Sequence, residues 1–405
     1  MNINVQPLVE SNNTFALDLY AKLSAGEDNL CFSPYSISVA LAMTLAGARG
    51  ITEKQMKDVL HTTLTQYEYH AGFAQLQKQI RTVGKDKNVE LLLANSIYPH
   101  NKYVFLESFV ICLRENYGTI ITPLDYNEPE SARKFVNQWV QEETQEHISE
   151  LIPAGVLDSL TRLILVNAIY FKGLWEKQFD KQKTIISPFW VTSDKSVEVP
   201  TMRQKAAFKY TEDDLVQILD LPYQGNGLSL IIILPKEHNT PANEGSGFVK
   251  IKKLKPRRQI ETPTKESDNL AKVERFLSLK KLSLWSKNMS EQTVEVHLPL
   301  FKIKSNLNLN KLLISMGMSD AFGERADFSG MDRTKELSIK HVFHQATVDV
   351  NEEGATATAA TAVVMAIRGL PQEYQFHASH PFIFLLRENT TGSILFIGRV
   401  LNPVV

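Results

Sequence analysis

Cysteine is scarce in this sequence, with only Cys31 and Cys112 among 405 residues. A small secreted fold held together by disulfides is therefore excluded, and a chain of this length has enough apolar material for a sizeable core. Both cysteines stand in apolar runs, at residues 30–32 and 110–113, where a thiol behaves as a small hydrophobic side chain. We expect two buried, unpaired thiols.

The sequence also lacks an excess of charge, a long hydrophobic run and a secretory start. Its 44 basic and 45 acidic side chains give a net charge of −1, which favours neither nucleic acid nor a membrane surface as a partner. No apolar run approaches the ~20 residues of a membrane span, and residues 1–15 contain no basic segment followed by an apolar one. We expect a soluble, monomeric, cytoplasmic protein, with unconventional secretion left open.

Motifs for catalysis and for cofactor binding are missing too. No GxSxG, HExxH, P-loop or GxGxxG motif occurs in a usable context, so we expect neither an enzyme nor a cofactor. Two histidine pairs suggest a metal site, namely His341 with His344 and His377 with His380. However, a spacing of three residues on a strand turns the two side chains to opposite faces, and no cysteine or carboxylate cluster joins them. We expect no metal site.

Hydrophobic periodicity divides the chain into a helical first part and a strand-rich second part. Apolar residues at helical spacing predict helices at 14–23, 36–48, 52–60 and 131–148, with one buried strand among them at 91–98. The last of these helices is expected to turn four side chains towards one side: Phe135, Trp139, Val140 and Ile148. Apolar runs and alternation then predict strands at 163–171, 228–234, 293–303, 339–350, 381–386 and 394–400. Helices followed by strands predict an α+β fold, and no repeat or linker divides the single domain of residues 1–405.

A polar segment at 239–268 interrupts the strand-rich part. It is rich in Gly, Pro, Ser and Thr, which predicts a long disordered surface loop. Its basic side chains are Lys250, Lys252, Lys253, Lys255, Arg257 and Arg258. Such a cluster could bind a polyanion such as a glycosaminoglycan or nucleic acid, and the alternative is a solvated insert without a partner.

A second unusual segment begins at residue 352 and reads EEGATATAATAVVMAIR. Residues 354–363 include nothing larger than valine, so the large apolar anchors of a core helix are missing. No charge occurs between Glu353 and Arg368, which is unusual for a solvated loop. Small and β-branched side chains fit between neighbouring strands, so this segment could be an exposed loop or an inserted strand. A flexible linker is the alternative that composition alone favours.

Several stretches, in this order and at these separations, resemble the serpin family over nearly the whole chain. They are FSPYSI at 32–37, TRLILVNAIYFKGLW at 161–175, Leu298-Pro299 followed by Phe301, EEG at 352–354, HPF at 380–382 and GRVLNP at 398–403. In lacking a secretory start, the sequence resembles the intracellular, ovalbumin-type branch of the family or its bacterial members. The resemblance implies a fold of three β-sheets with eight or nine helices, and a reactive-centre loop within residues 352–380.

The resemblance also implies a function, which is inhibition of a serine protease by a suicide-substrate mechanism. The protease cuts the loop, the loop inserts as a new strand into a metastable protein, and the protease stays attached as an acyl-enzyme. Insertion requires small side chains at the hinge, and Ala355 departs only mildly from the Thr or Ser usual there. The residues that match the hinge are Glu352, Glu353, Gly354, Ala355, Thr356, Ala357, Thr358, Ala359 and Ala360.

The position of the reactive bond follows from the family pattern, in which cleavage occurs after the residue sixteen places beyond the first hinge glutamate. Counting from Glu352 gives Arg368-Gly369. Arginine suits the primary pocket of a trypsin-like protease, where a carboxylate binds the guanidinium group. The bonds Met365-Ala366 and Val364-Met365 are secondary sites that would suit an elastase-like protease.

The family further implies a polar cluster beneath the central strands and a tryptophan near the place where the loop inserts. The matching residues are Ser33, Ser36, Asn167 and His344 for the cluster, and Trp175 for the tryptophan. Two other functions stay open. One is a non-inhibitory serpin that acts as a carrier or chaperone, and the other is an interaction protein that uses the basic insert.

Overall fold

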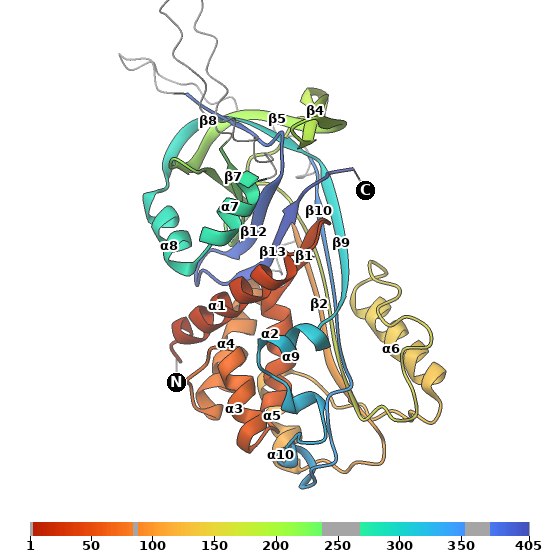
Figure 1. Cartoon of the computed structure of the whole chain (residues 1–405). Helices are drawn as coiled ribbons and strands as arrows, with labels where there is room; N and C mark the ends of the chain where they lie inside the picture. Colours follow the sequence, from red (N-terminus) through yellow and green to blue (C-terminus); the bar gives the residue numbers. More distant parts are fainter. Residues whose placement is uncertain (1–2, 84–87, 237–267, 353–372, 405) are drawn as a thin grey trace, which may run out of the picture.

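The computed structural model describes residues 3–83, 88–236, 268–352 and 373–404 (Figure 1). Nearly all of the basic insert and residues 353–372 of the loop region therefore lie outside the described residues. None of the described helices is long and apolar enough to cross a membrane.

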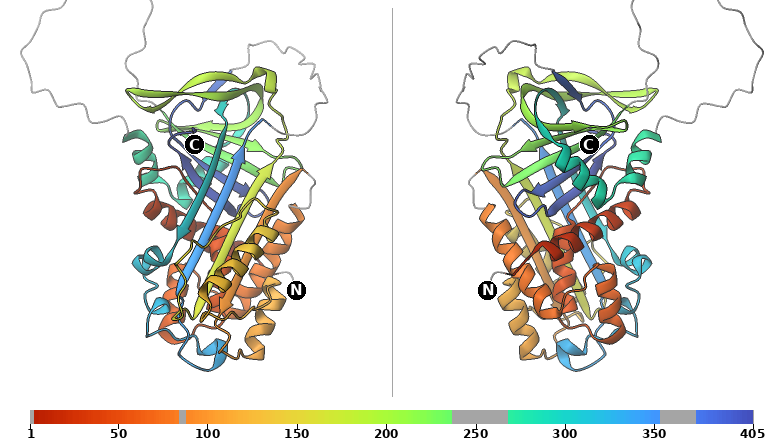
Figure 2. Two further views of the ribbon diagram at one scale, coloured as in Figure 1. Left: turned by 90° about the vertical axis from the view of Figure 1, so that its right-hand side faces the viewer. Right: turned by 90° about the vertical axis from the view of Figure 1, so that its left-hand side faces the viewer.

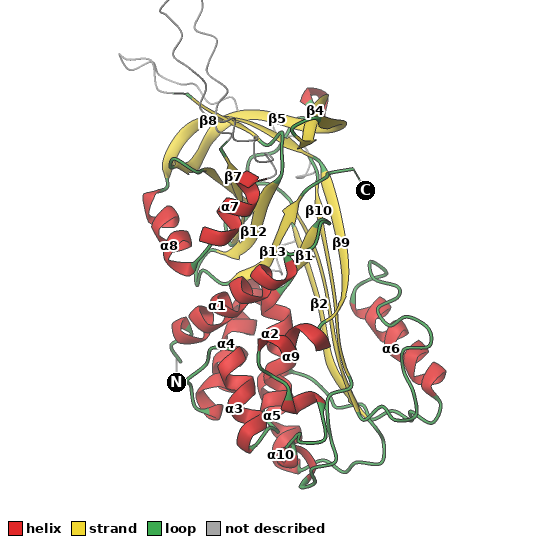
Figure 3. Cartoon of the chain, viewed as in Figure 1, coloured by secondary structure: helices red, strands yellow, loops and turns green. Residues whose placement is uncertain are grey.

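Ten α-helices form within the described residues, and most of them gather in the lower half of the molecule in Figure 3. Eight of them have nine residues or more, and α9 and α10 are shorter, so the described residues contain slightly more helices than the eight or nine expected. The helices are α1 (Gln6–Leu23), α2 (Pro34–Leu45), α3 (Gly50–Val59), α4 (Gln66–Val83), α5 (Glu107–Tyr117), α6 (Pro129–Glu143), α7 (Asp268–Phe276), α8 (Leu279–Asn288), α9 (Asn310–Met316) and α10 (Ser329–Asp332).

Thirteen strands make up the β-structure of the described residues. The strands are β1 (Leu30–Phe32), β2 (Val89–Pro99), β3 (Leu163–Gly173), β4 (Ile185–Thr192), β5 (Lys195–Glu212), β6 (Val216–Pro222), β7 (Leu228–Pro235), β8 (Ser290–Pro299), β9 (Phe301–Asn308), β10 (His341–Val350), β11 (Tyr374–His377), β12 (Phe382–Glu388) and β13 (Ile394–Val400). They pair as a four-stranded sheet and a nine-stranded sheet.

The four-stranded sheet has the order β2-β3-β10-β9 and runs along the length of the molecule, as the left view of Figure 2 shows. β2 is antiparallel to β3, and β10 is antiparallel to β9, whereas β3 and β10 are parallel. The central pair is therefore the one parallel pairing in this sheet. We call the line between β3 and β10 the seam.

The nine-stranded sheet contains two parts that share the long strand β5. Residues 195–201 of β5 pair with β4, residues 201–210 pair with β8, and residues 209–212 pair with β6. Counted by continuous hydrogen bonding, the described residues thus contain two sheets. The third sheet implied by the family resemblance corresponds to the part formed by β4, β5, β8 and β11.

Helix α2 holds the core together beneath the four-stranded sheet. Ser33 caps its N-terminus by accepting a hydrogen bond from the Ser36 N–H, and Pro34 occupies the first helical position, where it needs no N–H partner. All twelve residues of α2 are buried, because the helix lies against β2 and β3 on one side and α1 and β13 on the other. Helix α6 lies on the opposite face of the sheet (Figure 1).

Three expectations about elements and burial need correction. The predicted strand at 293–303 is two strands, β8 and β9, because the chain leaves one sheet at Leu300 and joins the other. The predicted helix at 131–148 ends at Glu143, and its Phe135 is 46% exposed. Cys31 is buried as expected, but Cys112 is only partly buried, since it lies on the half-exposed helix α5.

Candidate functional site

A row of polar side chains crosses three strands in the middle of the four-stranded sheet. Asn95 of β2 lies opposite Asn167 of β3, and Asn167 lies opposite His344 of β10. The N-terminus of α2 brings Ser33 and Ser36 against this row. The structure therefore brings together all four residues expected to form the polar cluster, and it adds Asn95.

Hydrogen bonds connect these five residues into one buried network. The Ser33 N–H donates to His344 Nε2 at 3.1 Å, and the His344 Nδ1–H donates to Asn167 Oδ1. Asn167 Nδ2 donates to Ser36 Oγ and to Asn95 Oδ1. Ser36 Oγ donates to Asn95 Oδ1 at 2.8 Å. One bond of the network, between His344 and Asn167, crosses the seam.

The network fixes the protonation state of His344. Because Nε2 accepts a hydrogen bond from a backbone N–H, the ring carries its single proton on Nδ1. Complete burial disfavours the charged imidazolium and lowers the pKa of His344 to about 3. The imidazole is therefore neutral at physiological pH and bridges α2 to β3.

The upper ends of β3 and β10 are held by Trp175. The indole Nε1–H donates to the backbone oxygen of Asn351, 2.8 Å away, directly after β10. The indole ring also stacks on Tyr223, with centroids 4.4 Å apart. One residue further on, Glu352 Oε1 accepts a hydrogen bond from Thr184 Oγ1 at 2.7 Å. The structure thus places Trp175 and the first hinge residue, Glu352, where the loop leaves the sheet.

The seam offers a place for one additional strand. A chain that leaves the end of β10 and turns back between β10 and β3 would run antiparallel to both. The sheet would then become antiparallel throughout, and antiparallel pairing is slightly more stable per residue than parallel pairing. Insertion would separate β3 from β10, so the hydrogen bond between His344 and Asn167 would have to break.

Strand β10 also carries buried polar atoms without partners. The side-chain amide of Gln345 and the hydroxyl of Thr347 have no hydrogen bond among the described residues, although both residues are buried. Each unsatisfied group costs about 1–3 kcal/mol. The strand therefore has polar groups available that a new neighbour could satisfy.

The remaining expected site residues lie outside the described residues. For the loop these are Glu353, Gly354, Ala355, Thr356, Ala357, Thr358, Ala359, Ala360, Arg368 and Gly369. For the basic insert they are Lys250, Lys252, Lys253, Lys255, Arg257 and Arg258.

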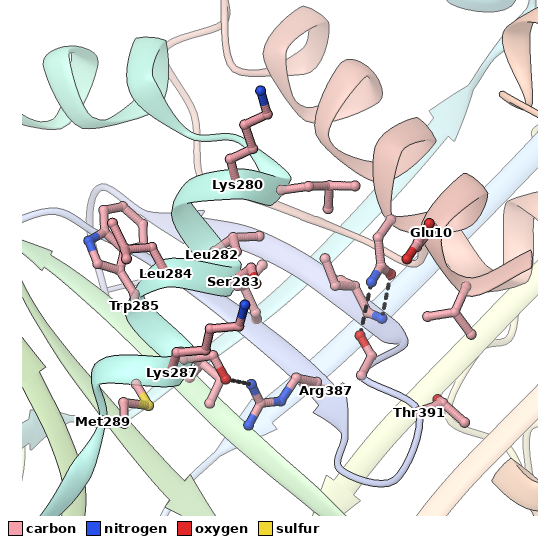
Figure 4. Close-up of a pocket in the computed structure, with 18 of the residues that line it drawn as sticks. Glu10, Lys280, Leu282, Ser283, Leu284, Trp285, Lys287, Met289, Arg387 and Thr391 are labelled. Carbon is pink, nitrogen blue, oxygen red and sulfur yellow. Dashed lines mark hydrogen bonds between the residues drawn. The ribbon is translucent and has the colours of Figure 1, made fainter. Parts of the chain in front are cut away.

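A cavity of about 850 Å³ lies away from the seam, between α1, α8 and the strands β7 and β12 (Figure 4). Its lining includes the apolar side chains of Ile231 and Leu385 and the basic side chains of Lys280, Lys287 and Arg387. Arg387 is tied by hydrogen bonds to Ser286 and Asp220. No sequence pattern predicted this cavity, because its lining comes from segments far apart along the chain.

Comparisons with known proteins agree with this geometry. The family model described as Serpin (serine protease inhibitor) matches residues 10–255 and 259–403. Leukocyte elastase inhibitor of Sus scrofa is 39% identical over 406 residues, covering 98% of this chain and 100% of that protein. Serpin B3 of Homo sapiens is 37% identical, covering 98% of this chain and 99% of that protein.

Solved structures give the same result. Uncleaved ovalbumin superposes with a TM-score of 0.82 at 26% identity, covering 98% of this chain and 100% of that chain. Maspin gives a TM-score of 0.85 at 26% identity, covering 98% of this chain and 99% of that chain. The chain belongs to the serpin family, which is described as a family of serine protease inhibitors and not of enzymes.

Proposed function

We propose that this serpin inhibits a trypsin-like serine protease as a suicide substrate, with Arg368-Gly369 as the reactive bond. The observation that carries the proposal is the parallel seam between β3 and β10, which begins where the loop leaves β10. An inserted strand there would make the whole sheet antiparallel and would offer partners to Gln345 and Thr347.

The chemistry begins as an ordinary proteolytic attack. The serine hydroxyl of the protease attacks the carbonyl carbon of Arg368, the peptide bond to Gly369 breaks, and the new amine takes up a proton. An ester then joins Arg368 to the protease. About fifteen residues of loop, at ~3.3 Å each, insert along the seam and carry the protease ~50 Å. Water does not complete the hydrolysis, because the displaced protease has lost its catalytic geometry.

The arginine supports trypsin-like specificity, although the named relatives include leukocyte elastase inhibitors. A buried carboxylate in a primary pocket binds a guanidinium through two charge-assisted hydrogen bonds. An elastase-like protease would instead use Met365-Ala366 or Val364-Met365. The two specificities therefore predict cleavage at different bonds.

The test is incubation of the full chain with trypsin, followed by a denaturing gel and mass spectrometry. We expect a covalent complex and release of a C-terminal peptide that begins at Gly369. In the variant Arg368→Ala, the rate of complex formation with trypsin should fall by roughly 100-fold or more. Cleavage at Arg368 without a complex would contradict inhibition, whereas a complex with elastase at Met365 alone would contradict the trypsin-like specificity.

A second function, that of a carrier, is favoured by the cavity beside α8. A volume of about 850 Å³ suits a small ligand, and its apolar and basic lining suits an anionic amphipathic one. Fluorescence titration with anilinonaphthalene sulfonate tests this function. Leu282→Trp should fill the cavity and abolish binding, and binding that is unchanged in this variant would exclude the cavity as the site.

Two smaller expectations complete the proposal. The unpaired thiols Cys31 and Cys112 support a reducing compartment such as the cytoplasm. For the basic insert at 250–258 we keep the expectation of polyanion binding, which should weaken steeply with salt. Neutralising these residues should abolish that binding and leave protease inhibition intact.

A further inference from the structure

Three side chains that are separated in the sequence meet where β11 joins β8, the strand at the upper end of the molecule in Figure 1. Glu295 and His297 come from β8, and His377 comes from β11. The two strands pair in parallel, with His377 directly opposite His297. Side chains two residues apart on a strand share a face, so Glu295 lies on the same face as both histidines.

The geometry brings the metal-binding atoms of these residues together. One ligand atom from each residue lies within 4.8 Å of the other two. His297 Nε2 is 3.2 Å from Glu295 Oε1, and the two imidazole rings stack with centroids 3.9 Å apart. His377 Nε2 is buried and has no hydrogen-bond partner among the described residues. Such an unsatisfied atom is costly, and a bound ion would supply its missing partner.

We propose that Glu295, His297 and His377 bind one divalent transition-metal ion of the zinc class. Two imidazoles and one carboxylate are a donor set found in zinc sites that keep a position open for water. Calcium and magnesium prefer sites made of oxygen ligands, so imidazole ligation selects against both. The expectation of no metal site rested on histidine pairs three residues apart in the sequence. It did not bring these three residues together, because they come from two strands that are distant in the sequence.

Two basic residues on the neighbouring strand β5 face this site. Arg203 lies opposite His297, and Lys205 lies opposite Glu295, where Lys205 forms an ion pair with Glu373 at 2.6 Å. Arg203 repels a cation, so Arg203→Gln should tighten metal binding.

The bound ion would strengthen the attachment of β11. This strand has only four residues and follows directly after residues 353–372. It is held to the rest of the sheet by its pairing with β8. A metal bridge between His377 and His297 would fasten the C-terminal end of the reactive loop region. This inference does not depend on the proposed inhibitory function.

The test is titration of the full chain with Zn²⁺ by calorimetry and with Co²⁺ by visible absorption. We expect one ion per chain and the Co²⁺ spectrum of a site with nitrogen and oxygen ligands. His297→Asn and His377→Asn should each weaken binding at least about tenfold, with a smaller effect for Glu295→Gln. Arg203→Gln should strengthen binding.

The matched control is His61→Asn, because His61 lies elsewhere and pairs with Asp18 at 2.7 Å. This variant should bind the ion like the unmodified chain. Binding that persists in the double variant His297→Asn/His377→Asn would place the ion elsewhere and overturn the proposal. Absence of binding to the unmodified chain up to 1 mM Zn²⁺, about the weakest affinity of interest, would overturn it as well. If an asparagine variant fails to fold, the Zn²⁺ affinity of Arg203→Gln tests the proposal instead. An affinity equal to that of the unmodified chain would contradict a site at these residues.

Discussion

At the residue scale, His344 joins three elements through two ring nitrogens. One nitrogen accepts from the start of α2, and the other donates across the seam to Asn167. A histidine that burial keeps neutral makes the protein sensitive to acid, because the unfolded chain can take up a proton that the folded protein cannot.

This coupling predicts a loss of stability at low pH. The pKa of His344 is about 3 in the folded protein, whereas an unfolded imidazole titrates near 6.5. The free energy of unfolding should therefore fall as pH drops below about 6.5, and this residue should account for about 2 kcal/mol between pH 6.5 and 4.5. Urea unfolding across this range measures the slope.

Burial also lowers the pKa of His70, to about 4. A variant is therefore needed to assign the loss of stability at low pH to His344. In His344→Gln the pH slope should become shallower, although the protein is less stable at pH 7. An unchanged slope would show that other groups cause the acid sensitivity.

The residues of the polar cluster differ in how well the sequence predicts them. Ser33, Ser36 and Asn167 lie in stretches that resemble the family, and His344 matches a position of the family's polar cluster, so the resemblance identified all four. Asn95 was missed because one amide within an apolar strand looks like any core polar residue until its register with Asn167 is known. Likewise, no local pattern connects His377 to Glu295 and His297.

At the element scale, the strands buried on both faces were the easiest to predict. β3, β7 and β13 are continuous apolar runs, and their observed bounds lie within two residues of the expected ones. The long strand β5 was missed because its exposed and buried residues do not alternate regularly along its length. Helices α4 and α5 were missed as well, although their buried residues recur at helical spacing, at 69, 73, 76 and 80 in α4 and at 109, 113 and 117 in α5.

A strand that inserts at the seam must have uncharged side chains at the positions that become buried. Every second side chain of the inserted strand must be buried between the sheet and the elements that cover it, and a buried unpaired charge is costly. We therefore expect Ala355→Arg to lower the yield of covalent protease complex at least about tenfold. Gel densitometry of complexed and cleaved chains measures this yield.

Ala355→Ser is the matched control, because serine is small and uncharged and should insert normally. Both variants should be cleaved after Arg368 at similar rates, since the substitution is thirteen residues from the reactive bond. A normal complex yield in Ala355→Arg would mean that residue 355 does not enter the sheet.

At the scale of the whole molecule, the parallel seam and the unsatisfied groups of β10 indicate that the native arrangement is not the most stable one available. Cleavage in the loop should therefore raise stability. We expect the melting temperature of the trypsin-cleaved protein to rise by roughly 10 °C or more, because about ten new ladder hydrogen bonds contribute about 1 kcal/mol each. Calorimetry of intact and cleaved protein tests this expectation.

Cleaved Ala355→Arg provides the comparison, since it has the same cut but a blocked insertion. Its melting temperature should stay near that of the intact protein. Equal melting temperatures for intact and cleaved unmodified protein would contradict a metastable native state.

The α+β class followed from the order of helices and strands, whereas the topology did not. Hydrophobic patterns contain no information about which distant strands become neighbours. β3 and β10 are separated by more than 160 residues, yet their pairing defines the seam. The family resemblance implied three sheets and an inserted strand, and the structure supplied the pairing of β3 with β10 and its register.

The seam has a consequence for mixtures of many molecules. A seam that would open for an extended segment with small side chains does not distinguish the loop of its own chain from the loop of a neighbouring chain. Insertion within one chain is independent of concentration, whereas insertion between chains grows with concentration. The feature that would trap a protease also gives the protein a route to linear chains linked end to end, in which each molecule completes the sheet of the next.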